Sequence, residues 1–232
     1  MVSHDFLTLM RGTMCEKTGL RRKRETPHQN ESRSLPDLTF ERGLTGVVCG
    51  IDEAGRGPLA GPVMAAAVVL PARLPDILTA QLDDSKVLSA AKRARLFEVI
   101  QDCGQVGVGR AEVDEIDRLN ILQATFLAMR RAVSGLAVDH ALVDGNRRPP
   151  LPCGVTCIVG GDSRSFSIAA ASVVAKVTRD RAMAVLAADF PGYGWERNAG
   201  YGTEEHRMAI RRLGVTPHHR RSFAPIADLL RE

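Results

Sequence analysis

The sequence has little that would tie it to a membrane or to an oxidising compartment. Among its 232 residues are five cysteines and no C-x-x-C pair, which favours reduced thiols over a disulfide framework. Cys153 and Cys157 could begin a zinc site, but no second pair accompanies them. No apolar run approaches the roughly 18 residues of a membrane span, and the first residues lack the pattern of a secretory signal. We therefore expect a cytoplasmic protein without membrane contact.

Aromatic residues are few, at 4%, and the surplus of positive charge is small and uneven. Residues 1–36 hold seven Lys or Arg against four Asp or Glu, a net of +3, and the other 24 basic and 23 acidic residues add +1 to give the total of +4. A nucleic-acid partner therefore cannot be argued from the total charge alone. Because residues 18–36 are polar, charged and without a period, we predict a disordered basic tail over 1–36.

After the tail, the pattern is typical of a packed α/β domain. Short apolar runs rich in β-branched residues predict strands at 47–51, 63–70, 105–110, 140–143 and 156–159. Amphipathic or Ala-rich stretches predict helices at 89–102, 121–133, 167–189, 204–213 and 222–231. This order implies a mixed sheet covered by helices. Glycine-rich turns after Phe190 separate a main domain over 37–190 from a small C-terminal helical extension over 191–232.

Acidic residues follow three of the predicted strands. Asp52 and Glu53 come after the first strand, Asp144 after the fourth and Asp162 after the fifth, each with glycine nearby. One such acid is usually a turn residue, but four acids with no basic residue among them repel one another unless a cation joins them. Adjacent strand residues point to opposite faces, so we expect the chain to leave the pleat at Asp52 and Glu53. Oxygen ligands suit Mg²⁺ or Mn²⁺, and two such ions can hydrolyse a phosphodiester.

Two other classes of function compete with this interpretation. Residues 55–60 fit the G-x-G-x-x-A pattern of a dinucleotide-binding oxidoreductase and follow a strand. That fingerprint requires a helix next, whereas Pro62 and the run 63–70 predict a second strand. A non-catalytic module that binds duplexes would use the glycine-rich loop and the extension, but would have no need of four acids.

An ordered series of motifs runs from residue 50 to residue 223. It consists of GIDEAGRGPLAGPV at 50–63, DSKVL at 84–88, VDGN at 143–146, GD at 161–162, SIAAASVVAKVTRD at 167–180, GYGT at 200–203 and HRRSF at 219–223. The series resembles the bacterial ribonuclease HII family, the type 2 ribonucleases H, from about Phe40 to the C-terminus. An ordered set of this kind is far more specific than any single motif.

This resemblance implies a ribonuclease H-like fold with the C-terminal helical extension, acting as a monomer. The implied reaction cleaves RNA in RNA/DNA hybrids, and cuts on the 5′ side of ribonucleotides embedded in duplex DNA, leaving 3′-hydroxyl and 5′-phosphate ends. By the family pattern the metal-binding catalytic acids are Asp52, Glu53, Asp144 and Asp162. The implied substrate contacts are made by Gly55, Arg56 and Gly57 at the ribose and phosphate and by Tyr201 at the 2′-hydroxyl, to which we add Lys86 as a phosphate contact.

Several charged residues have simpler interpretations. Asp180 rivals Asp162 as the fourth acid, but a helical acid flanked by arginines is more often salt-bridged or solvated. Lys176 and Arg179 could hold phosphates, although a surface charge is the commoner explanation. The resemblance also departs at Gly161, directly before the fourth acid, where we expect the family to carry a lysine. The missing cation predicts an altered metal dependence.

Overall fold

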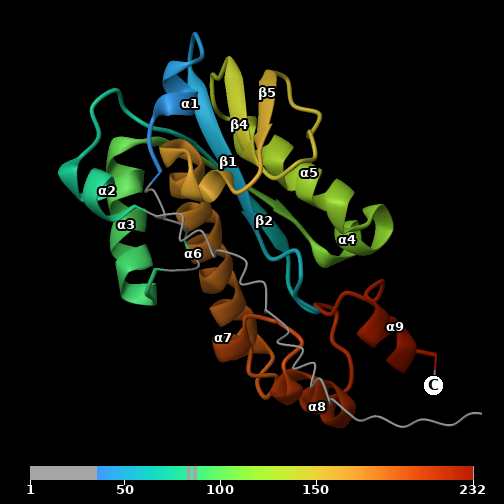
Figure 1. Cartoon of the computed structure of the whole chain (residues 1–232). Coiled ribbons are helices and arrows are strands. Elements are labelled where there is room, and N and C mark those ends of the chain that lie inside the picture. The colour runs from blue at the N-terminus through green and yellow to red at the C-terminus, as the bar shows by residue number, and fades with distance from the viewer. Residues whose placement is uncertain (1–35, 83–84, 86–87, 232) are drawn as a thin grey trace, which may run out of the picture. The chain divides into compact units, whose positions relative to one another are not determined.

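One mixed sheet organises the computed structural model, which describes residues 36–82, 85 and 88–231 (Figure 1). In that part of the chain the strands follow the order β3-β2-β1-β4-β5. They are β1 (Val48–Ala54), β2 (Val63–Val69), β3 (Gln105–Ala111), β4 (His140–Asp144) and β5 (Gly154–Ile158). β1 is antiparallel to β2 and parallel to β4, which is parallel to β5. The carboxyl ends of β1, β4 and β5 therefore lie at the same edge of the sheet.

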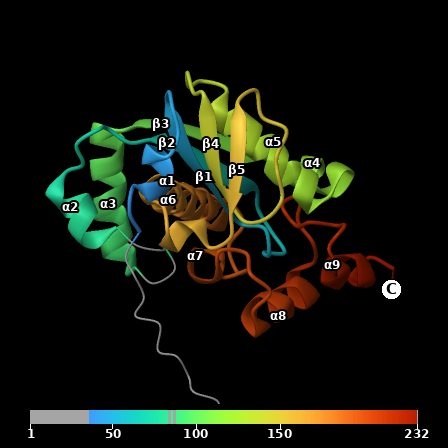
Figure 2. The same ribbon diagram turned by 45° about the horizontal axis from the view of Figure 1, so that its top comes forward.

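Helices cover both faces of the sheet (Figure 2). One face packs against α6 (Phe166–Asp189) and α3 (Ala90–Cys103), with the short α1 (Thr39–Arg42) and α2 (Asp76–Gln81) on the same side. The other face packs against α5 (Ile121–Val133), which is preceded by α4 (Val113–Leu119). The residues of β2 alternate between the two apolar clusters, as the two-residue period of a strand requires.

The start of α6 lies directly against β1. A Cβ atom at Gly50 would come within 2.0 Å of the backbone of Ser167, so only glycine permits this approach. Ser165 caps the helix by accepting a hydrogen bond from Ile168 N–H. Oε1 of Glu41, in α1, accepts a further bond from Ser167 N–H at 2.9 Å. These contacts hold the start of α6 against β1.

The segment after α6 packs onto the end of that helix. It contains α7 (Trp195–Asn198), α8 (Glu204–Leu213) and α9 (Ala224–Leu229). A third apolar cluster joins these helices to Met183 and Leu186 of α6 and to Leu59 and Ala60. Trp195 stacks on Tyr193 inside this cluster, with ring centroids 5.1 Å apart. The aromatic pair therefore packs the C-terminal segment onto its neighbour, and Trp195 is buried.

Backbone hydrogen bonds connect the loop after β1 to this C-terminal segment. Leu59 N–H donates to Gly200 O, Gly61 N–H donates to His218 O, and Arg220 N–H donates to Leu59 O. We call this junction of residues 55–62, 199–201 and 218–220 the seam. On the other side of the C-terminal segment, Asp117 of α4 accepts hydrogen bonds from Arg221 N–H and from Ser222.

All five predicted strands and all five predicted helices are present, and the helices predicted at 121–133 and 204–213 have the predicted bounds. β1 ends three residues later than predicted, β5 spans 154–158 instead of 156–159, and the last helix spans 224–229 instead of 222–231. A strand and not a helix follows residues 55–60, so the structural context of a dinucleotide site is missing. Apart from Pro36, the predicted tail lies outside the described residues.

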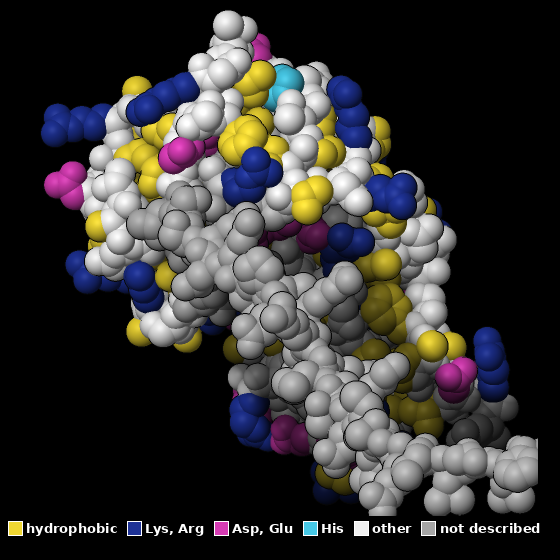
Figure 3. Space-filling view, viewed as in Figure 1, with side chains coloured by type: hydrophobic (Ala, Val, Ile, Leu, Met, Phe, Trp, Pro, Cys, Tyr) yellow, Lys and Arg dark blue, Asp and Glu magenta, His cyan; other side chains and the backbone are white. Residues whose placement is uncertain are grey.

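The surface of the described residues adds two observations. Lys and Arg side chains are scattered over the visible part of the face in Figure 3 and are not gathered into one patch. None of the described helices is long and apolar enough to cross a membrane.

Cys49, Cys103, Cys153 and Cys157 are free thiols, and burial raises the pKa of Cys49 to about 12.

Candidate active site

Three carboxylates meet at the edge of the sheet where β1, β4 and β5 end. Asp52 lies in β1, Asp144 is the last residue of β4, and Asp162 lies in the 3-10 turn η1 (Gly161–Ser163) that follows β5. One oxygen atom from each lies within 4.8 Å of those of the other two. Asp52 is 4% exposed and Asp162 is 6% exposed. We call these three residues the acid cluster.

The acid cluster concentrates negative charge in a place with little water. Burial, and then the charges of Glu53 and Asp144, raise the pKa of Asp52 well above its ordinary value. Hydrogen bonds from the Ser172 hydroxyl and from Glu53 N–H, the latter at 2.7 Å, act in the opposite direction. A divalent cation would relieve this repulsion, and the donor set of carboxylate oxygens fits Mg²⁺ or Mn²⁺.

Glu53 departs from the predicted arrangement. β1 continues through Ala54, with Asp52 opposite Ala66 and Glu53 opposite Ala65, so the chain does not leave the pleat at the two acids. Successive side chains of a strand alternate between faces, which places Glu53 outside the acid cluster. Its Oε1 accepts a hydrogen bond from Nη1 of Arg56 at 3.1 Å. The expected exit from the strand was wrong, although Glu53 remains near enough to raise the pKa of Asp52.

A pocket of about 260 Å³ opens in front of Asp52 and Asp144. Its lining includes five residues for which the sequence predicts a role in substrate or metal binding: Glu53, Gly55, Arg56, Gly57 and Tyr201. Tyr201 is 48% exposed. A Cβ atom at Gly57 would lie 3.6 Å from Cε1 of the Tyr201 ring, so the ring stands beside the loop. Lys86 lies outside the described residues.

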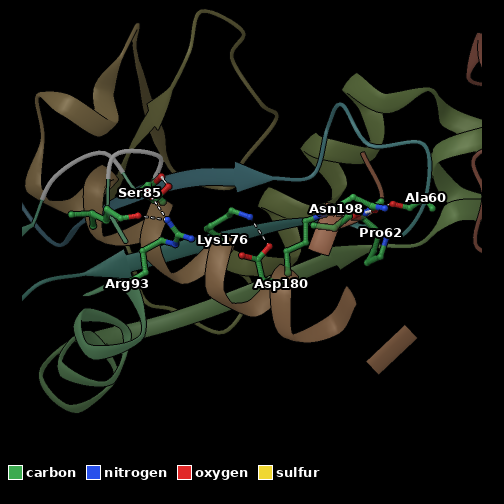
Figure 4. Close-up of polar contacts among 12 residues, drawn as sticks. Ala60, Pro62, Ser85, Arg93, Lys176, Asp180 and Asn198 are labelled. Carbon is green, nitrogen blue, oxygen red and sulfur yellow. Dashed lines mark hydrogen bonds and ion pairs between the residues drawn. The ribbon is translucent and has the colours of Figure 1, made fainter. Parts of the chain in front are cut away.

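Two charged residues of α6 pair near this pocket. Lys176, which lines it, donates to Oδ1 of Asp180 at 2.5 Å, and the two side chains point toward each other in Figure 4. Asp180 is not a member of the acid cluster. Arg179 is 1% exposed, so the interpretation of this arginine as a surface charge was wrong.

The sequence reasoning missed two serines in the pocket. Ser85 and Ser172 both line it, and their hydroxyl oxygens are 2.8 Å apart. Ser172 also holds the carboxylate of Asp52. Ser172 is the only hydroxyl in the otherwise apolar run 168–175. A single polar residue in such a run could have indicated a specific polar contact of this side chain.

A pair of buried histidines stands behind Tyr201. His206 Nδ1 is 2.9 Å from Tyr201 O, and Trp195 Nε1 donates to His206 Nε2 at 2.9 Å. A carbonyl can only accept, so Nδ1 of His206 carries the proton and its Nε2 is an acceptor. His219 Nδ1 accepts from Thr216 N–H, which places the His219 proton on Nε2, 3.2 Å from His206 Nε2. Two neutral rings therefore fix the backbone at Tyr201.

Gly161, where we expected the family to carry a lysine, lies close to Asp144 and Ile168. Its N–H donates to Oδ1 of Asp144 at 2.7 Å, and a Cβ atom there would lie 2.6 Å from Cδ1 of Ile168. The neighbouring Gly160 is exposed, and a Cβ atom there would meet nothing closer than Ser163 Oγ at 3.8 Å. A side chain at position 160 would have space but would meet a φ of +64°, a left-handed conformation that favours glycine, whereas one at position 161 would require the terminal methyl of Ile168 to move.

Comparisons with known proteins agree with this architecture. The family profile described as Ribonuclease HII matches residues 49–226. A Ribonuclease HII of Paramagnetospirillum magneticum is 64% identical over 199 residues, which cover 84% of this chain and 99% of that protein.

Solved structures show the same fold. The ribonuclease H2 of Pyrococcus horikoshii OT3 superposes with a TM-score of 0.64 at 25% identity, covering 78% of this chain and 96% of that one. A Bst ribonuclease HIII, solved in complex with Mn²⁺, gives a TM-score of 0.59 at 19% identity, covering 90% and 76% of the two chains. With its ribonuclease H-like mixed sheet and this degree of identity, the chain belongs to the bacterial ribonuclease HII family of metal-dependent endoribonucleases.

Proposed function

We propose that this enzyme hydrolyses the RNA strand of RNA/DNA hybrids and cuts on the 5′ side of single ribonucleotides embedded in duplex DNA. The observation that carries the proposal is the shared pocket. Asp52 and Asp144 of the acid cluster line it together with the glycine-rich loop and Tyr201. A phosphodiester lying across this pocket would present its phosphorus to the acids and its ribose to the loop.

The acids would hold the divalent ions that this chemistry needs. When bound, two Mg²⁺ or Mn²⁺ ions would supply an activated water and stabilise the leaving oxygen. Asp52, Asp144 and Asp162 are the ligands that the fold brings together, and Glu53 is our fourth candidate from the adjacent strand position. Ser172 orients Asp52, and Gly161 N–H orients Asp144.

Residues on the other side of the pocket would recognise the ribose. The 2′-hydroxyl distinguishes RNA from DNA, and it can both donate and accept a hydrogen bond. Tyr201 offers a phenolic hydroxyl and a ring face, and the lack of a side chain at Gly57 lets the substrate approach the backbone. Arg56, with half of its side chain exposed, is placed to contact a phosphate near the scissile bond.

We also propose that two parts of the chain have separate roles. Residues 37–190 would form the catalytic domain, and residues 191–232 would form an extension that holds the substrate. The third apolar cluster supports a tight attachment of the extension to α6. Tyr201 belongs to the extension, so both parts would contribute to one pocket.

A duplex with one ribonucleotide in an end-labelled DNA strand tests the proposal. With Mg²⁺ or Mn²⁺, we expect one cut on the 5′ side of the ribonucleotide and none in a matched all-DNA duplex. Chelation of the metal should abolish the cut. A cut on the 3′ side, or equal cutting of the all-DNA duplex, would overturn the proposal. Tight binding without metal and without any cleavage would favour a non-catalytic binding module.

A further inference from the structure

Two arginines are buried in the seam and surrounded by carbonyl oxygens. Arg179 of α6 donates from Nε to Pro62 O at 3.1 Å, from Nη2 to Ala60 O at 3.2 Å and from Nη1 to Ala199 O at 3.0 Å. Ala60 and Pro62 lie side by side at this point in Figure 4. Arg179 thus holds the loop after β1 against the backbone that leads to Tyr201.

Arg220 repeats the arrangement from the C-terminal segment. It donates from Nε to Gly61 O at 2.9 Å, from Nη1 to Arg56 O at 2.9 Å and from Nη2 to Gly55 O at 2.5 Å. Its exposed fraction is 0%. Together Arg179 and Arg220, which we call the arginine pair, satisfy six carbonyl groups of the seam.

The arginine pair has no carboxylate partner within the described part of the chain. Neither guanidinium takes part in a salt bridge there. Burial lowers the pKa of both residues, and burial followed by repulsion from Arg179 lowers the pKa of Arg220 to about 9. Both side chains remain protonated at neutral pH. Burying two unpaired positive charges is costly, so fixing a loop by this means calls for a functional reason.

The hydrogen bonds of Arg220 determine which way the loop presents its N–H groups. No peptide bond among the described residues is cis. In a trans peptide the C=O and N–H groups point in opposite directions. With Gly55 O and Arg56 O directed at Arg220, the N–H groups of Arg56 and Gly57 point away from Arg220. Both residues line the pocket, beside Tyr201.

Gly55 is adapted to the same arrangement. Its φ is +94°, a left-handed conformation that favours glycine. A Cβ atom there would lie 1.9 Å from Nε of Arg179. The backbone of the loop at Gly55 is therefore in direct contact with Arg179, and both residues border the pocket.

We propose that the arginine pair positions the Arg56 and Gly57 N–H groups as donors to the ribonucleotide at the cut, and adds positive charge behind them for its phosphate. This inference rests on the proposed function, because it assigns the means by which that pocket recognises ribose. Arg179 and Arg220 are positioning residues, since both are at most 1% exposed and direct their N–H groups at backbone carbonyls, although Arg179 also borders the pocket. A purely structural pair would hold the seam together without affecting the choice between RNA and DNA.

The test measures the affinity for a duplex with one ribonucleotide and for the matched all-DNA duplex, with Ca²⁺ in place of Mg²⁺ to limit cleavage. Arg220→Lys and Arg179→Lys keep the charge and remove the planar fork of donors. We expect each to reduce the ratio of the two affinities by about tenfold, since hydrogen bonds to the ribonucleotide are lost from a displaced loop. Binding of the all-DNA duplex should change little.

A matched control comes from the same helix. Arg181 of α6 is exposed, pairs with Glu98 and lies over Phe97. Arg181→Lys makes the same chemical change two residues from Arg179 and should leave the ratio unchanged. Hydrogen–deuterium exchange gives a second readout, in which the peptide over 55–62 should exchange faster in both seam variants while peptides of β2 and β3 keep their protection.

The outcomes separate the inference from the proposed function. If the wild-type protein itself does not prefer the ribonucleotide duplex, the proposed function fails. If the wild type prefers it and both seam variants keep that preference, the inference fails and the proposed function stands. Global unfolding of both variants would also overturn the inference, because it would make the arginine pair a general requirement of the fold.

Discussion

The acid cluster and the arginine pair border the same loop, yet they handle buried charge in opposite ways. The acid cluster brings like charges within 4.8 Å of one another, and burial, followed by the charges of Glu53 and Asp144, raises the pKa of Asp52. The arginine pair spreads two positive charges over six carbonyl oxygens of the chain itself. One region requires a counter-charge from solution, and the other obtains its partners from the backbone.

This difference separates the part of the site that responds to ions from the part that is built in by folding. Carboxylates at an open sheet edge can be reached by a hydrated cation, which must keep some of its waters. The two guanidinium groups are at most 1% exposed and already donate to carbonyls of the chain. We therefore expect metal ions to act on the acid cluster and to leave the geometry of the seam unchanged.

The largest effect should follow from breaking the acid cluster. Asp52→Asn, Asp144→Asn or Asp162→Asn should each reduce cleavage by about a thousandfold, because a lost metal ligand removes about 4 kcal/mol of transition-state stabilisation. Glu53→Gln should also suppress cleavage strongly, although Glu53 lies outside the acid cluster. Asp180→Asn is the control, since Asp180 pairs with Lys176 outside the cluster. An inactive Asp180→Asn enzyme beside an active Asp162→Asn enzyme would show that Asp180 is required for cleavage and that Asp162 is not.

The next effect concerns pH and the buried histidines behind the seam. Burial, and then the neighbouring His206, lower the pKa of His219 to about 4. In the unfolded chain the His219 ring binds a proton near pH 6.5, whereas in the folded protein it does so only near pH 4. The neutral buried ring therefore contributes its full share of the folding stability above pH 6.5, and this share is lost as the pH falls toward 4. The loss amounts to about 3 kcal/mol.

Urea denaturation at pH 7, 5.5 and 4.5 measures this effect. The difference in the free energy of unfolding between the wild type and His219→Gln should shrink across the series. The comparison with the variant is needed because the raised pKa of Asp52 acts in the opposite direction over part of the same range. A constant difference from pH 7 to 4.5 would contradict a neutral, buried His219.

Metal binding should stabilise the fold by a comparable or smaller amount. At an ion concentration of 100 times Kd, a ligand that binds only the folded state adds about 2.7 kcal/mol. We expect Mg²⁺ or Mn²⁺ to raise the melting temperature of the wild type and of Arg220→Lys. Asp52→Asn should lose most of this rise. A rise of equal size in Asp52→Asn would locate the stabilising ion elsewhere.

The smallest of these effects should come from the Tyr201 hydroxyl. Tyr201→Phe keeps the ring beside Gly57 and removes one hydrogen-bonding group. Cleavage at a single ribonucleotide should fall by about tenfold, while binding of all-DNA duplex through phosphates should persist. Cleavage rates and binding constants measured side by side check this. Unchanged cleavage would mean that the hydroxyl does not contact the substrate.

The meeting of Asp52, Asp144 and Asp162 could be predicted from the sequence because the signal for each acid lies in the few residues before it. Short apolar runs precede Asp52, Asp144 and Asp162 in the sequence and predict strands there, and the carboxyl ends of parallel neighbouring strands lie at one edge of a sheet. The exact end of β1 depends on pairing with β2, in which Ala54 lies opposite Met64. That pairing is a tertiary contact, so the strand's continuation through Glu53 could not be read from the acids and glycines that follow.

The burial of the arginine pair could not be predicted from the sequence, for a different reason. Arg179 lies in the run Thr178–Arg181 of charged and polar residues, which resembles the solvated side of a helix. Its burial depends on the C-terminal segment, which covers the end of α6 and brings Arg220 to the same loop. Composition and period describe one element at a time, so they carry no information about a guanidinium enclosed by the backbones of two distant segments.

The distance in sequence between Arg220 and its acceptors has a consequence for synthesis. Arg220 is separated by 165 residues from Gly55 and by 164 from Arg56. All members of the acid cluster leave the ribosome well before Arg220, since translation proceeds from the N-terminus. A nascent chain therefore has its carboxylates in place before the glycine loop is held in shape. If the arginine pair acts as we propose, selectivity would be the last property that the growing enzyme acquires, because a chain that stops short of residue 220 lacks Arg220.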